Sequence, residues 1–289
     1  ERSNRLKPGG TIIEGTGGNT GLSLAQLGAA KGYKVIVTAP SNVSKEKIDH
    51  CERFGATVIL APKEHDYSHP GNYARVAEQL SIETPNSIYT NQFENLANYR
   101  AHFSTTGPEI FSQTNGSVDA FVCSSGTGGT IGGVSAFLKT AKPSCRSFLI
   151  DPQGSVLYNY VTAGGTPTKG MTEIEGIGAD HITDNFKQAE LAGAMQGTDM
   201  EAVNMAYYVQ EKEGLFIGPS AALNLVGAVK VARKLGPGHT VVTILCDGGD
   251  RYMSKLFNKK WLEKQGLTPT KSKDLNFVQY SPILSSKKA

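Results

Sequence analysis

Two glycine-rich segments combine backbone amides with short polar side chains, and this combination is suited to binding anions. The first, residues 14–21 (EGTGGNTG), follows a short apolar run and precedes a helical pattern. Glycines permit close approach of the backbone, and free amides at a helix start attract an anion. Because Thr16, Asn19 and Thr20 add side-chain donors, we expect this loop to bind a carboxylate. A capped helix start is the structural alternative, and the glycine order does not match a dinucleotide fingerprint.

The second segment, residues 124–130 (SSGTGGT), lies at another junction between an apolar run and a helical pattern. Consecutive glycines let successive amides point into one concavity, which suits a phosphate group. The segment lacks the Gly-Lys-Ser/Thr ending of a Walker A loop. In a third segment, residues 214–222 (GLFIGPSAA), an expected apolar strand delivers Ser220 to the start of a helix. Ser220 is therefore a candidate ligand contact, with a simple helix cap as the alternative.

Alternating strand and helix patterns place these loops at strand ends. Expected strands cover residues 11–14, 34–38, 56–60, 88–89, 118–123, 146–151 and 240–246; expected helices cover 22–31, 44–54, 72–80, 130–139, 200–213 and 221–235. This rhythm predicts an α/β fold with two parallel-sheet domains, in which ligands bind at the carboxyl ends of strands. Residues 1–7 resemble the end of a helix. The polar stretch 154–180 predicts an irregular active-site loop or surface excursion.

The composition excludes several classes of protein. Hydrophobic residues make up 39% of the 289 residues and charged residues 19%, which is typical of a globular chain rather than a disordered one. A net charge of +3 is too small to indicate nucleic-acid binding, and we expect no membrane segment. The four cysteines form no CxxC pair, so we expect no metal site. Cys123 and Cys246 lie in or just after apolar runs and are expected to be buried free thiols in a reducing compartment.

Together, these loops resemble motifs of the cysteine synthase and cystathionine β-synthase family, and they are closest to the cysteine synthases. The match covers nearly all of residues 6–267. It continues through NQFENLANYRAHFSTTGPEI (91–110), IEGIGA (174–179) and CDGGDRYMSKLF (246–257). The resemblance implies fold type II of the pyridoxal-phosphate enzymes, the fold of the tryptophan synthase β subunit, and a homodimer. We expect a smaller substrate-loop domain at 1–95, a larger phosphate-binding domain at 96–265 and a C-terminal extension at 266–289.

The resemblance also implies a role for each matched residue. Asn19 would hydrogen-bond the phenolic oxygen of the pyridoxal phosphate ring, Ser220 would meet its pyridine nitrogen, and the loop around Gly176 would close over it. The cofactor phosphate would be bound by Gly126, Thr127, Gly128, Gly129 and Thr130. The substrate carboxylate would be bound by Thr16, Gly17, Gly18, Thr20 and Gln92.

A hydroxyl at Ser220 has a chemical consequence. It is a neutral partner that does not hold the pyridine nitrogen protonated, so the ring is a weaker electron sink. That favours β-replacement, in which O-acetylserine loses its leaving group and sulfide adds to give L-cysteine. The alternatives are the condensation of serine with homocysteine by a cystathionine β-synthase, and a catalytically silent relative that binds a ligand or partner. A dehydratase is disfavoured, because residues 16–20 do not match the Ser-Ser-Gly-Asn-His type of loop.

Two departures from the family pattern stand out. The substrate loop commonly reads TSGNTG, whereas Gly17 replaces the serine here. The Schiff-base lysine of the family lies upstream of this loop in a Ser-x-Lys-Asp-Arg context, and no lysine of this chain has that context. Since a lysine serves as imine link and base, we expect it to precede Glu1 and the 289-residue chain alone to be inactive. We expect the protein to be intracellular, in the cytoplasm or mitochondrion.

Overall fold

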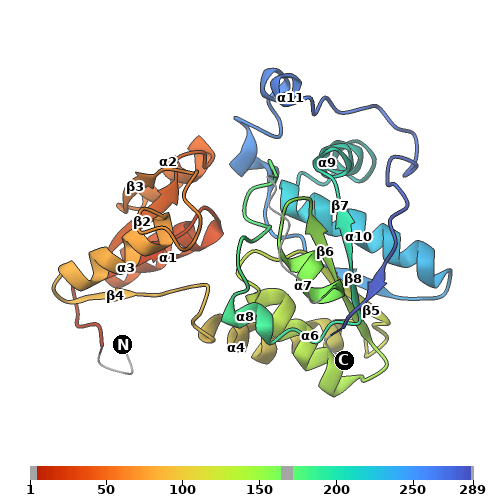
Figure 1. Ribbon diagram of the computed structural model, residues 1–289, viewed down its shortest axis with the longest axis horizontal. Coiled ribbons are helices and arrows are strands. Elements are labelled where there is room, and N and C mark those ends of the chain that lie inside the picture. The colour runs from red at the N-terminus through yellow and green to blue at the C-terminus, as the bar shows by residue number, and fades with distance from the viewer. Residues whose placement is uncertain (1–4, 164–171, 288–289) are drawn as a thin grey trace. The chain divides into compact units, whose positions relative to one another are not determined.

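The computed structural model describes residues 5–163 and 172–287. The chain divides into two compact units, unit 1 (Glu1–Gln92) and unit 2 (Phe93–Ala289), each with its own sheet (Figure 1). Both units are α/β with mainly parallel strands, so the predicted fold class is confirmed. None of the helices in the described ranges combines the length and apolar character needed to cross a bilayer.

Unit 1 is a four-stranded parallel sheet with helices between the strands. Its strands are β1 (Thr11–Gly15), β2 (Lys34–Pro40), β3 (Thr57–Ala61) and β4 (Ser87–Tyr89), in the order β3-β2-β1-β4. The helices are α1 (Asn19–Lys31), α2 (Lys45–Arg53) and α3 (Tyr73–Glu83). Leu22 and Ala25 of α1 pack against Val35 and Val37 of β2. Because β1 lies inside the sheet and ends at Gly15, it delivers the loop before α1 to the carboxyl edge, as parallel sheets do for ligand sites.

Unit 2 has a five-stranded sheet in the order β8-β5-β6-β7-β9, with β9 antiparallel at the edge. Its strands are β5 (Ala120–Cys123), β6 (Arg146–Pro152), β7 (Gly193–Gly197), β8 (Val241–Thr243) and β9 (Leu284–Ser285). Its helices are α4 (Ala97–Ser104), α5 (Thr106–Gln113), α6 (Gly129–Ala141), α7 (Leu157–Thr162), α8 (Asp184–Lys187), α9 (Asp199–Glu213), α10 (Pro219–Leu235) and α11 (Lys259–Gln265), with a 3-10 turn η1 (Gly249–Tyr252).

Alternate residues of the central strands of unit 2 enter two separate cores. Phe121 and Leu149 belong to the core that includes residues of α6 and α7, whereas Val122 and Ile150 belong to the core that includes residues of α9 and α10. Side chains of a strand alternate between faces, so helices cover both faces of this sheet. Such two-sided burial fixes the register of β5 and hence the position of the loop that follows it.

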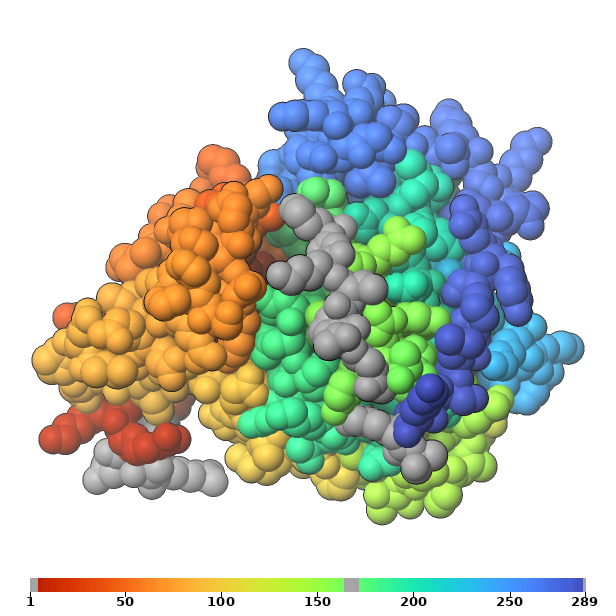
Figure 2. Space-filling view, viewed as in Figure 1, coloured from red at the N-terminus to blue at the C-terminus, as the bar shows by residue number. Residues whose placement is uncertain are grey.

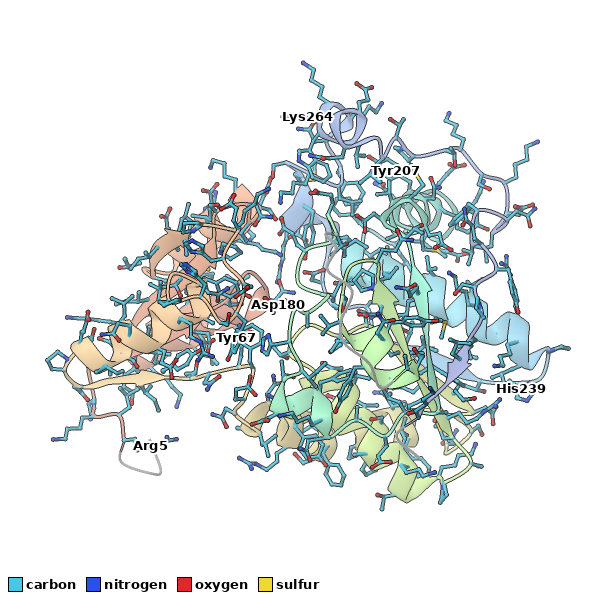
Figure 3. All side chains as sticks on the ribbon, in the orientation of Figure 1. Arg5, Tyr67, Asp180, Tyr207, His239 and Lys264 are labelled. Carbon is cyan, nitrogen blue, oxygen red and sulfur yellow. The ribbon has the colours of Figure 1, made fainter. Side chains whose placement is uncertain are left out.

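The C-terminal segment after Gly266 runs over the surface of unit 2, in dark blue in Figure 2. Arg233 of α10 donates from Nη1 to Val278 O at 2.7 Å and from Nη2 to Leu275 O at 2.8 Å. Gln279 N donates to Glu201 Oε1 at 2.9 Å. Tyr207 on α9, labelled in Figure 3, donates its hydroxyl to Leu256 O at 3.2 Å. These contacts attach the segment and the residues before α11 to the helical face of unit 2.

Several sequence predictions need correction. The stretch 154–180 is not irregular throughout, because α7 forms at Leu157–Thr162; residues 164–171 of that stretch lie outside the described residues. Residues 5–7 of the expected N-terminal helix end are not helical, and residues 1–4 lie outside the described residues. The expected strand 240–246 ends at Thr243. Before Ser220 there is a single bridge between Ile217 and Gly248 rather than a strand. Cys123 is buried as expected, whereas Cys246 is exposed.

Candidate active site

The predicted carboxylate loop of unit 1 is organised by hydrogen bonds among its own polar groups. Gly18 N donates to Thr16 Oγ1 at 2.9 Å, so the Thr16 side chain fixes the turn before α1. Thr20 Oγ1 donates to Gln92 Oε1 at 2.6 Å, and Gln92 Nε2 donates to Gly15 O at 2.7 Å. The structure therefore brings Gln92, distant in sequence, to the loop that contains the other predicted carboxylate ligands.

A buried carboxyl group lies behind this loop. Glu14, the residue before the end of β1, is fully buried. It accepts hydrogen bonds from the Thr90 hydroxyl, from Gln92 N at 3.2 Å and from Gly15 N at 3.0 Å. Burial raises the pKa of Glu14 to about 7, against the lowering effect of these hydrogen bonds. Glu14 thus positions both the loop and Gln92, and its charge depends on pH near neutrality.

A lysine also contacts the carboxylate loop. Lys47 of α2 is 5% exposed, and its Nζ donates to Gly17 O at 3.3 Å. A buried ammonium group next to the loop adds positive charge where an anion is expected to bind, in addition to the amides at the start of α1. The sequence shows a charged helix at residues 44–54 but does not show that this one lysine points inward.

The predicted phosphate loop of unit 2 forms a turn at the start of α6. Gly128, the residue before the helix, has φ +88°, a conformation that glycine adopts without strain. A Cβ at Gly128 would lie 2.5 Å from the backbone nitrogen of Phe186. Ser124 and Ser125 are buried, and their Oγ atoms have no hydrogen-bond partner in the described part of the chain. Buried hydroxyls that lack partners, together with the amides of a helix start, fit the phosphate of pyridoxal phosphate.

Helix α4 holds the two threonines of the phosphate loop. Asn98 Nδ2 donates to Thr127 Oγ1 at 2.9 Å. His102 Nε2 lies 3.2 Å from Thr130 Oγ1, and its Nδ1 lies 2.9 Å from Thr106 Oγ1. Burial lowers the pKa of His102, so the ring is neutral near pH 7 and interacts with these hydroxyls as one donor and one acceptor. Sequence analysis missed Asn98 and His102, although their spacing of four residues places them on one helix face.

The backbone around Gly176 rests on the phosphate loop. Gly178 N donates to Ser125 O at 2.9 Å. A Cβ added to Gly126 would lie 2.3 Å from Gly176 O, so the two backbones are in direct contact. Gly176 and Gly178 both have positive φ, +83° and +79°. The structure therefore brings the backbone of Gly176 to the predicted phosphate loop.

Ser220 lies at the second position of α10 and is buried. Its hydroxyl is within hydrogen-bonding reach of the Cys246 thiol. Asn224, one turn further along α10, donates to Cys246 Sγ at 3.4 Å and accepts from Ser124 N at 2.6 Å. The start of α10 is thereby tied to the phosphate loop, and a hydroxyl rather than a carboxylate is present at the position predicted to meet the pyridine nitrogen.

Comparison with known proteins agrees with this geometry. Residues 1–247 match the family model described as pyridoxal-phosphate dependent enzyme. The chain is 44% identical to the cysteine synthase of Dictyostelium discoideum, over 96% of this chain and 76% of that protein. It is 47% identical to cysteine synthase 1 of Emericella nidulans, over 92% and 73%. The crystal structure of an O-acetylserine dependent cystathionine β-synthase from Helicobacter pylori matches with a TM-score of 0.79 and 34% identity, over 88% and 80%.

Proposed function

The chain belongs to the pyridoxal-phosphate dependent enzyme family, and on that premise we propose that it is a cysteine synthase that forms L-cysteine from O-acetylserine and sulfide. In this β-replacement the bond from the β-carbon to the acetate oxygen breaks, a carbon–sulfur bond forms, and acetate leaves. The observation that carries the proposal is the identity of 44% and 47% to two cysteine synthases over nearly the whole chain. The site geometry of each unit supports it.

We propose the following division of roles among the residues. Thr16, Gly17, Gly18, Thr20 and Gln92 bind the substrate carboxylate, and the bond from Thr20 to Gln92 keeps their donors oriented. The amides and hydroxyls of Gly126, Thr127, Gly128, Gly129 and Thr130 bind the cofactor phosphate, supported by Asn98 and His102. Asn19 and Ser220 orient the ring, and the backbone around Gly176 limits access of water to it.

Pyridoxal phosphate, when bound, supplies the electron sink that makes the α-proton of the amino acid removable. The Ser220 hydroxyl, as a neutral partner of the pyridine nitrogen, would keep this sink weak and so would favour loss of the β-substituent together with the α-proton. Substrate contacts at the carboxylate hold the α-carbon in a fixed orientation, and this positioning accounts for much of the rate in such sites.

The direct test is turnover by the complete gene product. We expect formation of cysteine and acetate in equal amounts from O-acetylserine and sulfide, measured by colorimetric cysteine detection and an acetate assay. Absence of both products from protein that contains bound pyridoxal phosphate by mass spectrometry would refute the proposal. The likeness to an O-acetylserine dependent cystathionine β-synthase favours a second candidate, in which homocysteine replaces sulfide. A kcat/KM for homocysteine above that for sulfide would support this second candidate.

Lys47 provides a prediction about substrate affinity. We expect Lys47→Met to raise KM for O-acetylserine about tenfold, with a smaller change in kcat, because the ammonium contact with the loop is lost. Lys47→Arg keeps the charge and should recover most of the affinity. Lys45→Met is the control, since Lys45 lies on the same helix but is exposed and paired with Asp49. Equal KM values for Lys47→Met and Lys45→Met would contradict a role for Lys47 at the loop.

We also propose that the protein is a homodimer and acts in the cytoplasm or mitochondrion, as the family resemblance suggests. Light scattering after size-exclusion chromatography tests the first proposal, with a mass twice that of the chain expected. Fractionation of cells that express the tagged gene product tests the second. A monomeric mass or a secreted product would contradict the respective proposal.

A further inference from the structure

We propose that the ion pair between Glu175 and Lys255, here called the latch, positions residues 172–178 over the phosphate loop and thereby sets how tightly the cofactor is held. This inference rests on the proposed function, because the phosphate loop is taken as the cofactor site. Glu175 and Lys255 are positioning residues in this proposal. Neither is assigned a contact with the substrate or the cofactor.

The latch is a partly buried ion pair. Lys255 Nζ contacts Glu175 Oε1, and the side chains are 16% and 12% exposed. The ammonium also lies 5.8 Å from the centre of the Trp261 ring, within the range of a cation–π interaction. Partial burial reduces screening by water, so the attraction exceeds that of an exposed surface pair. Removing one partner takes away the opposite charge that the other, mostly buried group faces, which is costly.

Residues 172–178 are fixed at both ends by other contacts. At one end, Asp199 at the start of α9 accepts from Thr172 Oγ1 at 2.6 Å and from Glu173 N at 2.8 Å. At the other end, Gly178 N donates to Ser125 O. Glu175 lies between these anchors, directly before Gly176. The latch therefore acts on the part of the segment whose backbone touches the phosphate loop.

The buried Ile174 side chain anchors the segment before Glu175, but the glycines that follow leave the backbone there few constraints of its own. Gly176 and Gly178 have positive φ, and no Cβ limits the backbone conformations available to them. Gly176 is exposed, and a Cβ there would meet no atom within 4 Å, so packing around its α-carbon does not hold it in place. Without the latch, the backbone between Glu173 and Gly178 gains conformational freedom. The carbonyl that rests on Gly126 would then no longer be held against the phosphate loop.

Hydrogen–deuterium exchange of the complete gene product tests the latch without turnover. We expect the peptide that covers residues 172–178 to exchange about tenfold faster in Glu175→Gln and in Lys255→Met than in the wild type. The apparent Kd for pyridoxal phosphate should rise by a similar factor. Glu173→Gln is the matched control, because Glu173 is a neighbouring carboxylate that forms no ion pair in the described part of the chain; it should leave both quantities unchanged.

Two further measurements separate the ion pair from a general loss of stability. The charge-swapped double variant Glu175→Lys/Lys255→Glu should recover slow exchange of residues 172–178. Trp261 is the single tryptophan of the chain, so quenching of its fluorescence by acrylamide reports local opening beside Lys255. We expect stronger quenching in Lys255→Met and in Glu175→Gln, with little change in the exchange of the core strands β5 and β6.

The outcomes are distinct. Exchange and cofactor affinity in Glu175→Gln equal to those in Glu173→Gln would overturn the latch. Exchange in the charge-swapped variant as fast as in Glu175→Gln would overturn the role of the ion pair. Neither measurement depends on cysteine formation, so failure of the cysteine synthase assay would refute the proposed function while leaving these results interpretable.

Discussion

Replacement of Gly126 by alanine is expected to raise the Kd for pyridoxal phosphate on the order of 100-fold. The added Cβ would lie 2.3 Å from Gly176 O, a separation that atoms do not tolerate. A Cβ atom is fixed by the backbone of residue 126, and its neighbour is a backbone carbonyl, so no change of side-chain rotamer relieves the clash. Either the phosphate loop or residues 172–178 must move, and overpacking of this kind costs about 1–3 kcal/mol, equivalent to roughly 5- to 150-fold in binding.

The measurement is a titration of the cofactor-free complete gene product with pyridoxal phosphate, followed by absorbance. Thermal unfolding of each variant without cofactor shows whether a loss of binding reflects a loss of folding. Gly214→Ala is the control for glycine replacement: Gly214 has φ +67° at the end of α9, and a Cβ there would meet nothing within 4 Å. It should lower the unfolding temperature slightly and leave the Kd unchanged. A Kd for Gly126→Ala within threefold of the wild type would show that the two backbones do not constrain the cofactor site.

The sequence was sufficient for most strands of the two sheets and for the loops at their ends, but it did not predict β7 or β9 of unit 2. Apolar runs such as residues 34–38 and 146–151 are short and bounded by turns, so their pattern has one plausible interpretation. It was not sufficient for α7. That helix is short and lies in a stretch rich in glycine and threonine. Its contacts include Tyr158 N donating to Asp151 Oδ2 at 2.7 Å and, from a distant part of the chain, Lys287 N donating to Val161 O at 3.0 Å.

The strand predicted from the apolar run 240–246 was too long for a different reason. Its hydrophobic character continues beyond Thr243, but the chain leaves the sheet there, and Leu245 is 46% exposed. A sequence pattern indicates which side chains are apolar, but it does not indicate where the neighbouring strand, and with it the strand pairing, ends. The same limit explains the supporting residues of the site. Glu14, Lys47 and Glu175 look like ordinary surface charges in the sequence, and only their burial and partners in the structure distinguish them.

Glu14 leads to the second large expected effect, a dependence of stability on pH. Its pKa is about 7 in the folded protein and 4.5 as the ordinary value, so the folded state binds this proton more tightly than the unfolded state. The stabilisation is therefore fully present below about pH 4.5 and is lost as pH rises through about 7. Its total is about 3 kcal/mol, of which about 2 to 3 kcal/mol is lost between pH 5 and pH 8.

Comparison of the wild type with Glu14→Gln isolates this contribution. Glutamine has nearly the same shape but does not ionise, so any effect of its amide group on the unfolding free energy is the same at every pH. Burial also raises the pKa of Asp151 in unit 2 to about 7, but that contribution is present in both proteins and cancels in the difference. We expect the wild type to lose about 2 to 3 kcal/mol of unfolding free energy relative to Glu14→Gln between pH 5 and pH 8 in urea titrations. Parallel pH profiles would contradict a titrating Glu14.

The same proton should affect substrate affinity. The Gln92 side chain accepts a hydrogen bond from the Thr20 hydroxyl, and the Gln92 backbone N–H donates to the Glu14 carboxyl group. Gln92 therefore links Glu14 to the proposed carboxylate site. Ionisation of Glu14 places a negative charge behind a loop that must bind an anion, and because Glu14 is fully buried this repulsion is weakly screened. KM for O-acetylserine should therefore rise several-fold from pH 6 to pH 8 in the wild type and much less in Glu14→Gln. A KM profile that is the same in both proteins would assign the pH response to another group.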